Sequence, residues 1–260
     1  KRGVEESEGD YSTATIYDFA NDVNEIVNYL SNHKNIKKDA IGLIGHSEGG
    51  IIAPIVASKN NNVSYIVLLA GMAIDGVSCL NSQYETLLKM QYGDTKSTKK
   101  LINNFKKTNK IIANWNYNYK DTLKLTKELN KRWDLLKNTM PTNTSKEDYL
   151  NLEIKNNTNP WIISFLKINP KKYLNQTKCP VLALNGEKDY QVVAKDNLRS
   201  IEKELKKGGN KNYTIKSYPK LNHLFQESYT GLAFEYSKIE KTIATYVLED
   251  MFNWCKKIVE

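Results

Sequence analysis

The sequence contains little cysteine and histidine and no long apolar run. Its three cysteines, Cys79, Cys179 and Cys255, are an odd number without paired spacing. They therefore indicate neither a disulfide framework nor a metal site. No apolar run approaches the ~20 residues that cross a bilayer, and no glycine-rich phosphate loop is present. We expect no transmembrane segment, no metal ion and no cofactor.

The charge of the chain is positive and unevenly distributed. Charged residues make up 26% and hydrophobic residues 40% of the 260 residues, which is typical of a globular protein. The net charge is +9, and the segment from Lys96 to Lys137 alone holds 12 Lys and Arg against 3 Asp and Glu. Such a segment could attract an anionic substrate or surface, but we favour solvated helix faces. No nucleic-acid recognition motif accompanies the lysines, so we expect no nucleic-acid partner.

Helix and strand patterns alternate at both ends of the chain. Residues 13–31 repeat apolar side chains at three- and four-residue steps, which predicts an amphipathic helix. Short runs that are apolar at successive positions predict buried strands of a parallel sheet. The expected strands are 40–45, 63–71, 181–185 and 213–218. The other expected helices are 48–58, 193–207 and 236–258.

The alternation stops between residues 74 and 177, where helical patterns occur without a convincing strand. Ser145-Lys146-Glu147-Asp148 resembles the capping box at a helix start. A segment of this length is too long for a plain loop in a compact domain. We therefore expect a helical lid at 74–177, inserted into an α/β core formed by residues 1–73 and 178–260.

A serine stands at the turn between a predicted strand and a predicted helix, in Gly45-His46-Ser47-Glu48-Gly49. Gly-x-Ser-x-Gly in this context is typical of a nucleophile elbow. The glycines allow the close backbone approach of a sharp turn that holds the serine in a strained conformation. The pattern predicts Ser47 as a nucleophile; the alternative is a serine in an ordinary glycine-rich turn.

The base that a nucleophilic serine needs is sought among only three histidines. His46 lies inside the elbow, and we expect its side chain to point away from that of Ser47. His33 lies at a polar helix end and is interpreted as a surface residue. His223 remains, in a loop after the predicted strand 213–218, and we predict it as the base.

The acid that orients the histidine is expected after the apolar run 181–185. Asp189 is the preferred candidate, with Glu187 and Asp196 as competitors. Asp189 could instead cap the helix that begins near residue 193. Both Asp189 and His223 fall just past the carboxyl ends of predicted strands, where ligands lie in open α/β sheets.

The order Ser47, Asp189, His223 is that of α/β-hydrolases, and the chain resembles this superfamily over its whole length. More narrowly, it resembles the bacterial serine-aminopeptidase-like branch, which contains many esterases. The resemblance implies a mostly parallel sheet flanked by helices, with a helical lid. The segments that carry it are Lys1-Arg2-Gly3-Val4, residues 9–19, residues 42–50, Asn159-Pro160-Trp161, residues 184–189 and Asn222-His223.

The resemblance departs from the family pattern at the start of the chain. In the family, an Asp-Lys-Arg-Gly motif follows the fourth strand, whereas here Lys1-Arg2-Gly3 come first. We therefore expect the N-terminal strands, and a loop that supplies one oxyanion-hole amide, to be missing from the sequence as given. The strand at 40–45 would then have an unpaired apolar edge. The family commonly has Gly-Lys-Ser where this chain has Glu5-Glu6-Ser7.

These residues and the resemblance predict a serine hydrolase of carboxylic ester or amide bonds in small molecules, with ester favoured. Ser47 would form an acyl-enzyme, His223 would take its proton, and Asp189 would orient His223. The Glu48 amide would bind the oxyanion. Glu48 could also hold a substrate amine through its side chain, as in an aminopeptidase.

Three tryptophans of the insertion, Trp115, Trp133 and Trp161, are candidates for lining the substrate pocket, although helix-spaced aromatics also form cores. The alternatives on the same fold are an aminopeptidase, an acyltransferase, or a non-catalytic binding protein. The sequence leaves the location open between the cytoplasm and the bacterial periplasm or envelope; family members often carry an export signal, so the resemblance implies that an envelope location fits. The sequence predicts no oligomeric state.

Overall fold

The computed structural model describes residues 2–260, so Lys1 of the Lys1-Arg2-Gly3-Val4 motif lies outside the described residues. The chain folds into two compact units. The sheet unit comprises Tyr17–Asp75 and Asn169–Glu260, and the helical unit comprises Gly76–Ile168 with the residues up to Ile16. The predicted insertion, 74–177, begins near Gly76 but ends after Ile168, and the residues up to Ile16, which the sequence assigns to the core, group with the helical unit. The predicted role of the helical unit as a lid stays a prediction.

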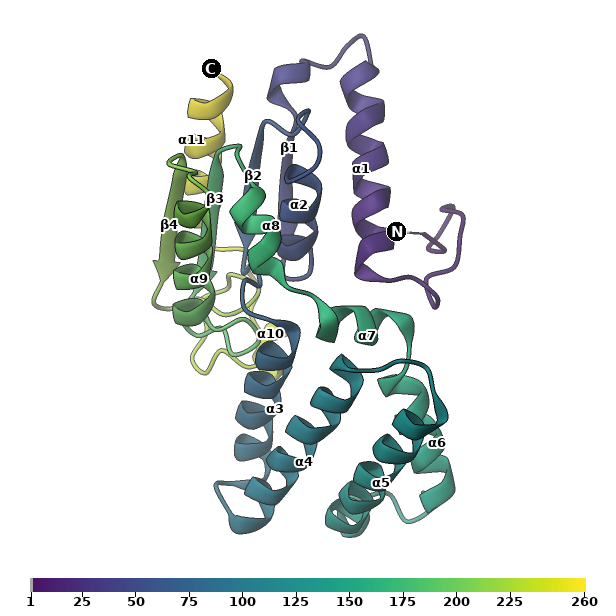
Figure 1. Ribbon diagram of the computed structural model, residues 1–260. Helices are drawn as coiled ribbons and strands as arrows, with labels where there is room; N and C mark the ends of the chain where they lie inside the picture. The colour runs from purple at the N-terminus through teal and green to yellow at the C-terminus, as the bar shows by residue number, and fades with distance from the viewer. Residues whose placement is uncertain (1) are drawn as a thin grey trace. The chain divides into compact units, whose positions relative to one another are not determined.

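The sheet unit is built on four parallel strands in the order β1-β2-β3-β4 (Figure 1). The register pairs Ile44 with Val67, and Val67 with Leu182. The predicted parallel sheet is therefore confirmed, and it joins segments from both ends of the chain. The strands are β1 Gly42–His46, β2 Tyr65–Leu69, β3 Val181–Gly186 and β4 Tyr213–Tyr218.

Helices cover both faces of this sheet, with α2, α8 and α9 on one face and α11 on the other (Figure 1). The α11 face buries Val67, Leu182 and Leu184 against Val247 and Met251. Every residue of β3 is buried, as expected for a parallel strand between two helical layers. The helices of this unit are α1 Ile16–Asn32, α2 Gly49–Ala57, α8 Pro170–Gln176, α9 Ala194–Lys207, α10 Ala233–Tyr236 and α11 Thr245–Val259.

The single helix predicted at 236–258 is wrong, because the structure contains a short α10 and a separate α11. The carbonyl of Tyr236 accepts a hydrogen bond from the Gln226 side chain. The amide of Ala244 donates to the carbonyl of Phe225. Long-range contacts at both ends therefore hold residues 237–244 outside a helix, and the predicted helix forms only from α11 onward.

One edge of the sheet is apolar and exposed. Among the described residues, β1 pairs only with β2, and the side chain of Ile44 is 58% exposed. This agrees with the unpaired apolar edge that the sequence predicts for this strand. None of the helices in residues 2–260 combines the length and apolarity needed to cross a membrane.

The helical unit contains α3 to α7, and no strand occurs within residues 76–168 of the described chain. As predicted, Ser145 caps a helix, since its hydroxyl accepts a hydrogen bond from the Asp148 amide at 3.0 Å. The helices are α3 Gly76–Tyr92, α4 Lys96–Ala113, α5 Tyr119–Leu136, α6 Lys146–Asn157 and α7 Pro160–Lys167.

A buried arginine joins three of these helices. Arg132 of α5 is 1% exposed, and its guanidinium stacks 3.6 Å from the ring centroid of Phe105 in α4. It donates hydrogen bonds to Asn104 and Thr108 of α4 and to Glu153 of α6, at 2.7 to 3.0 Å. The guanidinium thus supplies a charged donor to the buried side-chain oxygen of Asn104 and a further partner to Thr108 and Glu153.

We expect Arg132→Ala to lower the free energy of unfolding by about 3 kcal/mol or more. The substitution leaves the buried Asn104 and Thr108 oxygens without this donor and removes the counter-charge of Glu153. Urea unfolding followed by circular dichroism measures the change.

A matched control is Lys137→Ala, because Lys137 forms an exposed ion pair with Asp134 at 3.8 Å. Exposed pairs contribute little, so the control should stay within about 0.5 kcal/mol of the wild type. Equal losses in the two variants would contradict the role assigned to the buried guanidinium.

Candidate active site

Ser47 stands in a strained turn between β1 and α2. Its backbone φ is 54°, in the left-handed region that residues other than glycine adopt only at an energetic cost. Two hydrogen bonds hold it there. The Ser47 amide donates to the carbonyl of Leu69 at 2.9 Å, and the Gly50 amide donates to the carbonyl of Ser47 at 3.0 Å. The predicted sharp turn is present at this serine.

The glycines around the serine differ in how strictly the structure requires them. A Cβ at Gly45 would lie 2.0 Å from the carbonyl oxygen of Gly49, and one at Gly50 would lie 2.4 Å from the Cα of Gly71. A Cβ at Gly49 meets nothing within 4 Å. Close backbone contact therefore demands glycine at 45 and 50, whereas position 49 has room for a side chain.

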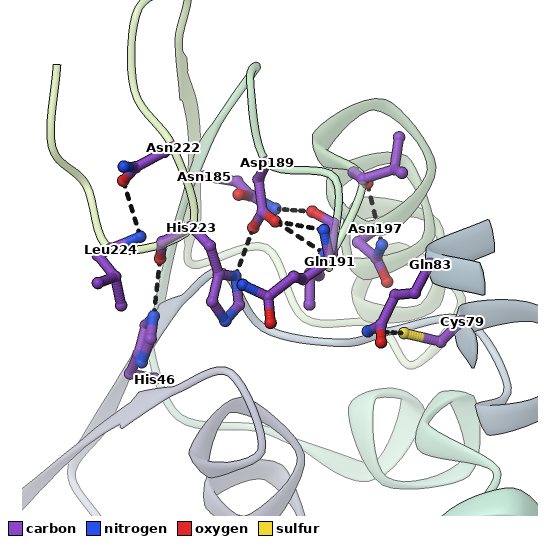
Figure 2. Close-up of polar contacts among 12 residues, drawn as sticks. His46, Cys79, Gln83, Asn185, Asp189, Gln191, Asn197, Asn222, His223 and Leu224 are labelled. Atoms are coloured by element: carbon purple, nitrogen blue, oxygen red, sulfur yellow. Dashed lines mark hydrogen bonds and ion pairs between the residues drawn. The ribbon is translucent and has the colours of Figure 1, made fainter. Parts of the chain in front are cut away.

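A histidine and a carboxylate meet just beyond β3 and β4 (Figure 2). Nδ1 of His223 lies 2.7 Å from Oδ2 of Asp189, and both residues are buried. The other oxygen, Oδ1, accepts hydrogen bonds from the amides of Gln191 and Val192 at 2.8 and 2.9 Å. An ionised carboxylate only accepts, so Nδ1 carries the proton and Nε2 is left as the basic nitrogen.

The competing carboxylates do not contact this histidine. Glu187 is exposed and accepts a hydrogen bond from the Ser217 hydroxyl at 2.6 Å. Asp196 is exposed in the first turn of α9. The structure thus pairs His223 with Asp189, the preferred candidate of the sequence. The helix-capping alternative is not what is found, since Val193 holds the N-cap position of α9 and its side chain makes no cap bond.

The loop that carries His223 is shaped by its neighbour Asn222, which is fully buried. Its Oδ1 accepts hydrogen bonds from the amides of Leu224 and Gln226 at 2.9 and 3.0 Å. Its Nδ2 donates to Oε1 of Gln226 at 3.0 Å. Asparagine often closes such turns through its own backbone neighbours. An asparagine directly before His223 was therefore the sequence signal for a closed turn, although no role was predicted for Asn222.

In the described part of the chain, the other two histidines make no hydrogen bond to Asp189. His33 is half-buried just after α1, and its Nδ1 accepts a hydrogen bond from the Asn35 amide. His46 lies at the end of β1, where its Nε2 is 2.8 Å from the carbonyl oxygen of His223. Its ring centroid is 4.7 Å from that of His223. Partial removal from water lowers the pKa of His46, and the hydrogen bond to the carbonyl opposes this shift.

The structure therefore brings two of the three predicted catalytic residues into contact. Within residues 2–260, the hydroxyl of Ser47 makes no hydrogen bond to the ring of His223. The elbow and the His223 loop nevertheless meet through His46, the residue next to Ser47. The Ser47–His223 contact stays a prediction, as does the role of the Glu48 amide, which lies at the N-terminal end of α2.

The three tryptophans predicted to bind substrate belong to the helical unit. Trp115 is 5% exposed and packs in an apolar cluster with Leu125 and Leu129. The ring of Trp133 is 5.3 Å from that of Tyr149, and the ring of Trp161 stacks on Phe165 at 5.3 Å. Trp115 thus lies in a buried core, and substrate contact by the three tryptophans stays a prediction.

A thiol nucleophile is disfavoured at the cysteine of the sheet unit nearest to β3. Burial raises the pKa of the Cys179 thiol to about 11, so very little of the reactive thiolate is present near neutral pH. Burial likewise raises the pKa of Cys255.

A parallel sheet covered by helices on both faces, with a strained serine elbow and an Asp–His pair beyond its strands, defines the α/β-hydrolase class. Residues 23–246 match the family described as "BAAT / Acyl-CoA thioester hydrolase C terminal". The chain belongs to this family and is a hydrolase of the α/β-hydrolase superfamily. A comparison with curated proteins gives no match.

Solved structures share the fold. An esterase from Exiguobacterium antarcticum is 14% identical over 98% of this chain and 79% of that chain, with a TM-score of 0.50. A lipase-esterase related protein from Clostridium acetobutylicum is 21% identical over 85% of this chain and 73% of that one, with a TM-score of 0.44. The Pyrococcus horikoshii acylaminoacyl peptidase is 16% identical over 79% of this chain, with a TM-score of 0.42, but only 23% of its own length is covered. At 14% identity, the likeness to the Exiguobacterium esterase shows the fold alone.

The two motif glycines allow a matched test of the elbow. We expect Gly45→Ala to destabilise the sheet unit by about 3 kcal/mol or to prevent folding, because its Cβ would collide with the Gly49 carbonyl. Gly49→Ala should be neutral or raise stability by about 0.5 kcal/mol, because alanine favours helix more than glycine does. Thermal unfolding of both variants measures the difference, and similar behaviour of the two would contradict the elbow geometry.

Asp189→Asn should lower kcat about 10⁴-fold, because an amide can hold His223 in the wrong tautomer and does not stabilise the imidazolium. The neutral side chain keeps an acceptor for the Gln191 and Val192 amides, so we expect little loss of stability. Steady-state hydrolysis of a p-nitrophenyl ester measures the effect.

The controls for this variant are the two rejected carboxylates. Glu187→Gln and Asp196→Asn should keep wild-type turnover, because neither carboxylate contacts His223. A full loss in Glu187→Gln with activity retained in Asp189→Asn would show that the acid is misassigned.

Proposed function

We propose that this chain carries the catalytic centre of a serine hydrolase that cleaves ester-type bonds, thioesters included, through an acyl-enzyme on Ser47. The observation that carries the proposal is the 2.7 Å contact between Asp189 and His223 in the same unit as the strained serine elbow. Membership of a family described by thioester hydrolysis supports the ester-cleaving reaction and favours a thioester substrate.

In the proposed first half-reaction, Oγ of Ser47 attacks the substrate carbonyl while Nε2 of His223 takes its proton. Asp189 holds the imidazole by accepting from Nδ1 and stabilises the imidazolium that forms. The tetrahedral oxyanion accepts a hydrogen bond from the Glu48 amide at the start of α2, where the helix dipole also favours negative charge. Collapse of this intermediate returns the proton from His223 to the leaving alcohol or thiol.

In the second half-reaction, His223 takes a proton from water as the water attacks the acyl-enzyme. The carboxylic acid leaves and Ser47 regains its proton. The same centre would perform acyl transfer if another nucleophile replaced the water, and peptide-terminal cleavage if the leaving group were an amine. Thiolates leave more readily than amines, so a centre of this kind hydrolyses thioesters and esters more easily than amides.

The helical unit is proposed to supply the pocket for the acyl or leaving group, with Trp133 and Trp161 as candidate contacts. The basic helices α4 and α5 offer no specific support for an anionic substrate. Their lysines are mostly exposed, while Leu101, Ile102 and Leu125 are buried. This distribution is that of amphipathic helices with solvated charged faces.

Ser47→Ala should abolish hydrolysis of p-nitrophenyl and acyl-thioester substrates by the full-length protein and should end labelling by a fluorophosphonate probe. The reason is that both reactions require the serine oxygen as the attacking atom. Turnover of an oxygen ester, a thioester and an anilide of one acyl group gives the bond preference, which we expect to fall in the order thioester, ester, anilide.

Ser217→Ala is the matched control, because Ser217 is an exposed serine of β4 whose hydroxyl bonds only to Glu187 in the described structure. It should react with the probe and turn over substrate as the wild type does. A wild-type protein that is folded yet inert toward the probe would favour a non-catalytic binding protein. Retained turnover in Ser47→Ala would show that the nucleophile is misassigned.

A further inference from the structure

His46 occupies the first x position of the Gly-x-Ser-x-Gly motif, directly before Ser47. It contacts the loop that carries His223. Its Nε2 lies 2.8 Å from the backbone carbonyl oxygen of His223 (Figure 2). A carbonyl oxygen only accepts, so Nε2 of His46 must carry a proton and donate it. Both the Nε2–H tautomer and the imidazolium meet this requirement, so the bond persists when His46 titrates.

The packing of the ring supports the same contact. The His46 and His223 rings lie with centroids 4.7 Å apart at an interplanar angle of 47°, and the ring centroids of His46 and Phe225 are 6.4 Å apart at 64°. Phe225 is itself buried, with φ of 60°, a conformation that a bulky residue adopts only when its surroundings impose it. His46 thus packs on a loop whose backbone has little freedom to adjust.

The other contacts of this loop act within the loop or fix it to the rest of the sheet unit. Asn222 ties Leu224 and Gln226 to one another from inside the loop. The Ala244 amide, just before α11, donates to the carbonyl of Phe225. These contacts set the shape of the loop, whereas the His46 bond relates the loop to the strand that carries the nucleophile.

We propose that His46 is a positioning residue that sets the distance between Ser47 and His223, by donating Nε2–H to the His223 carbonyl. The donor belongs to the residue next to the nucleophile and the acceptor to the base itself, so one hydrogen bond fixes the two relative to each other. The inference rests on the proposed function. Displacements of about 1 Å in such a pair can lower a rate by ~10²-fold.

The variants His46→Phe and His46→Gln separate the donor from the ring. Phenylalanine keeps an aromatic ring of similar size but has no donor, and glutamine keeps an amide donor at about the reach of Nε2 without the ring. We expect His46→Phe to lower kcat roughly 10- to 100-fold with KM nearly unchanged. His46→Gln should recover most of that loss. The measurements are steady-state hydrolysis of a p-nitrophenyl ester and the rate of fluorophosphonate labelling of Ser47 in the full-length protein.

A merely structural role for His46 predicts a different pattern. If the ring only covers the loop, His46→Phe should keep wild-type rates and His46→Gln should lose activity in step with its melting temperature. That pattern, or equal losses in both variants, would overturn the proposal. His46→Asn is a further variant for the case that His46→Phe does not fold, because its shorter amide does not reach the carbonyl. It should lose kcat while His46→Gln retains it, and equal rates in these two would also overturn the proposal.

The failure of this inference and the failure of the proposed function give distinct results. If Ser47 is not the nucleophile, Ser47→Ala keeps turnover and the wild type is not labelled at Ser47. If only the positioning role is wrong, the wild type is labelled at Ser47, Ser47→Ala is inactive, and His46→Phe reacts at the wild-type rate.

Discussion

Parallel pairing of four strands is the constraint on which the candidate site depends. In a parallel sheet the carboxyl ends of all strands lie at the same end of the sheet. The residues that follow β1, β3 and β4 therefore gather there, although they are far apart in the sequence. Ser47, Asp189 and His223 are those residues. The helical unit is inserted between β2 and β3, so the chain completes half of the sheet before it enters the insertion and half after it.

Close contacts hold three residues at the carboxyl end of the sheet in an unfavourable backbone conformation. Ser47, Ala70 and Phe225 all have positive φ, and each lies in a turn beyond a strand of the sheet. Backbone hydrogen bonds across the sheet fix two of them, since the amide of Ser47 donates to Leu69 and that of Ala70 donates to Leu184. Strain of this kind persists only when the surrounding fold imposes it, and it is common at functional sites. The sheet thus stabilises turns that the local sequence alone would not favour.

The candidate acid, the candidate base and the serine elbow are held in different ways. Asp189 has both oxygens occupied, one by two backbone amides and the other by His223, so its charge and its direction are fixed together. His223 is fixed through its ring by Asp189 and through its backbone by His46. Ser47 is fixed through its backbone alone. This division is consistent with a nucleophile whose hydroxyl rotates while the base stays in place.

The strands, the turn at Ser47 and the pairing of Asp189 with His223 could be predicted from the sequence, because periodicity, glycine spacing and chain order are local or sequential properties. The sequence predicted one helix at 236–258, where contacts of Tyr236 and Ala244 with the His223 loop interrupt the helical pattern. The sequence predicted no contact for the side chain of His46. The contact of His46 could not be predicted from the sequence, because its acceptor is a backbone carbonyl 177 residues away and a carbonyl group is the same in every residue. Which donor reaches the His223 carbonyl depends on how the chain folds, and no local sequence pattern around His46 indicates this contact.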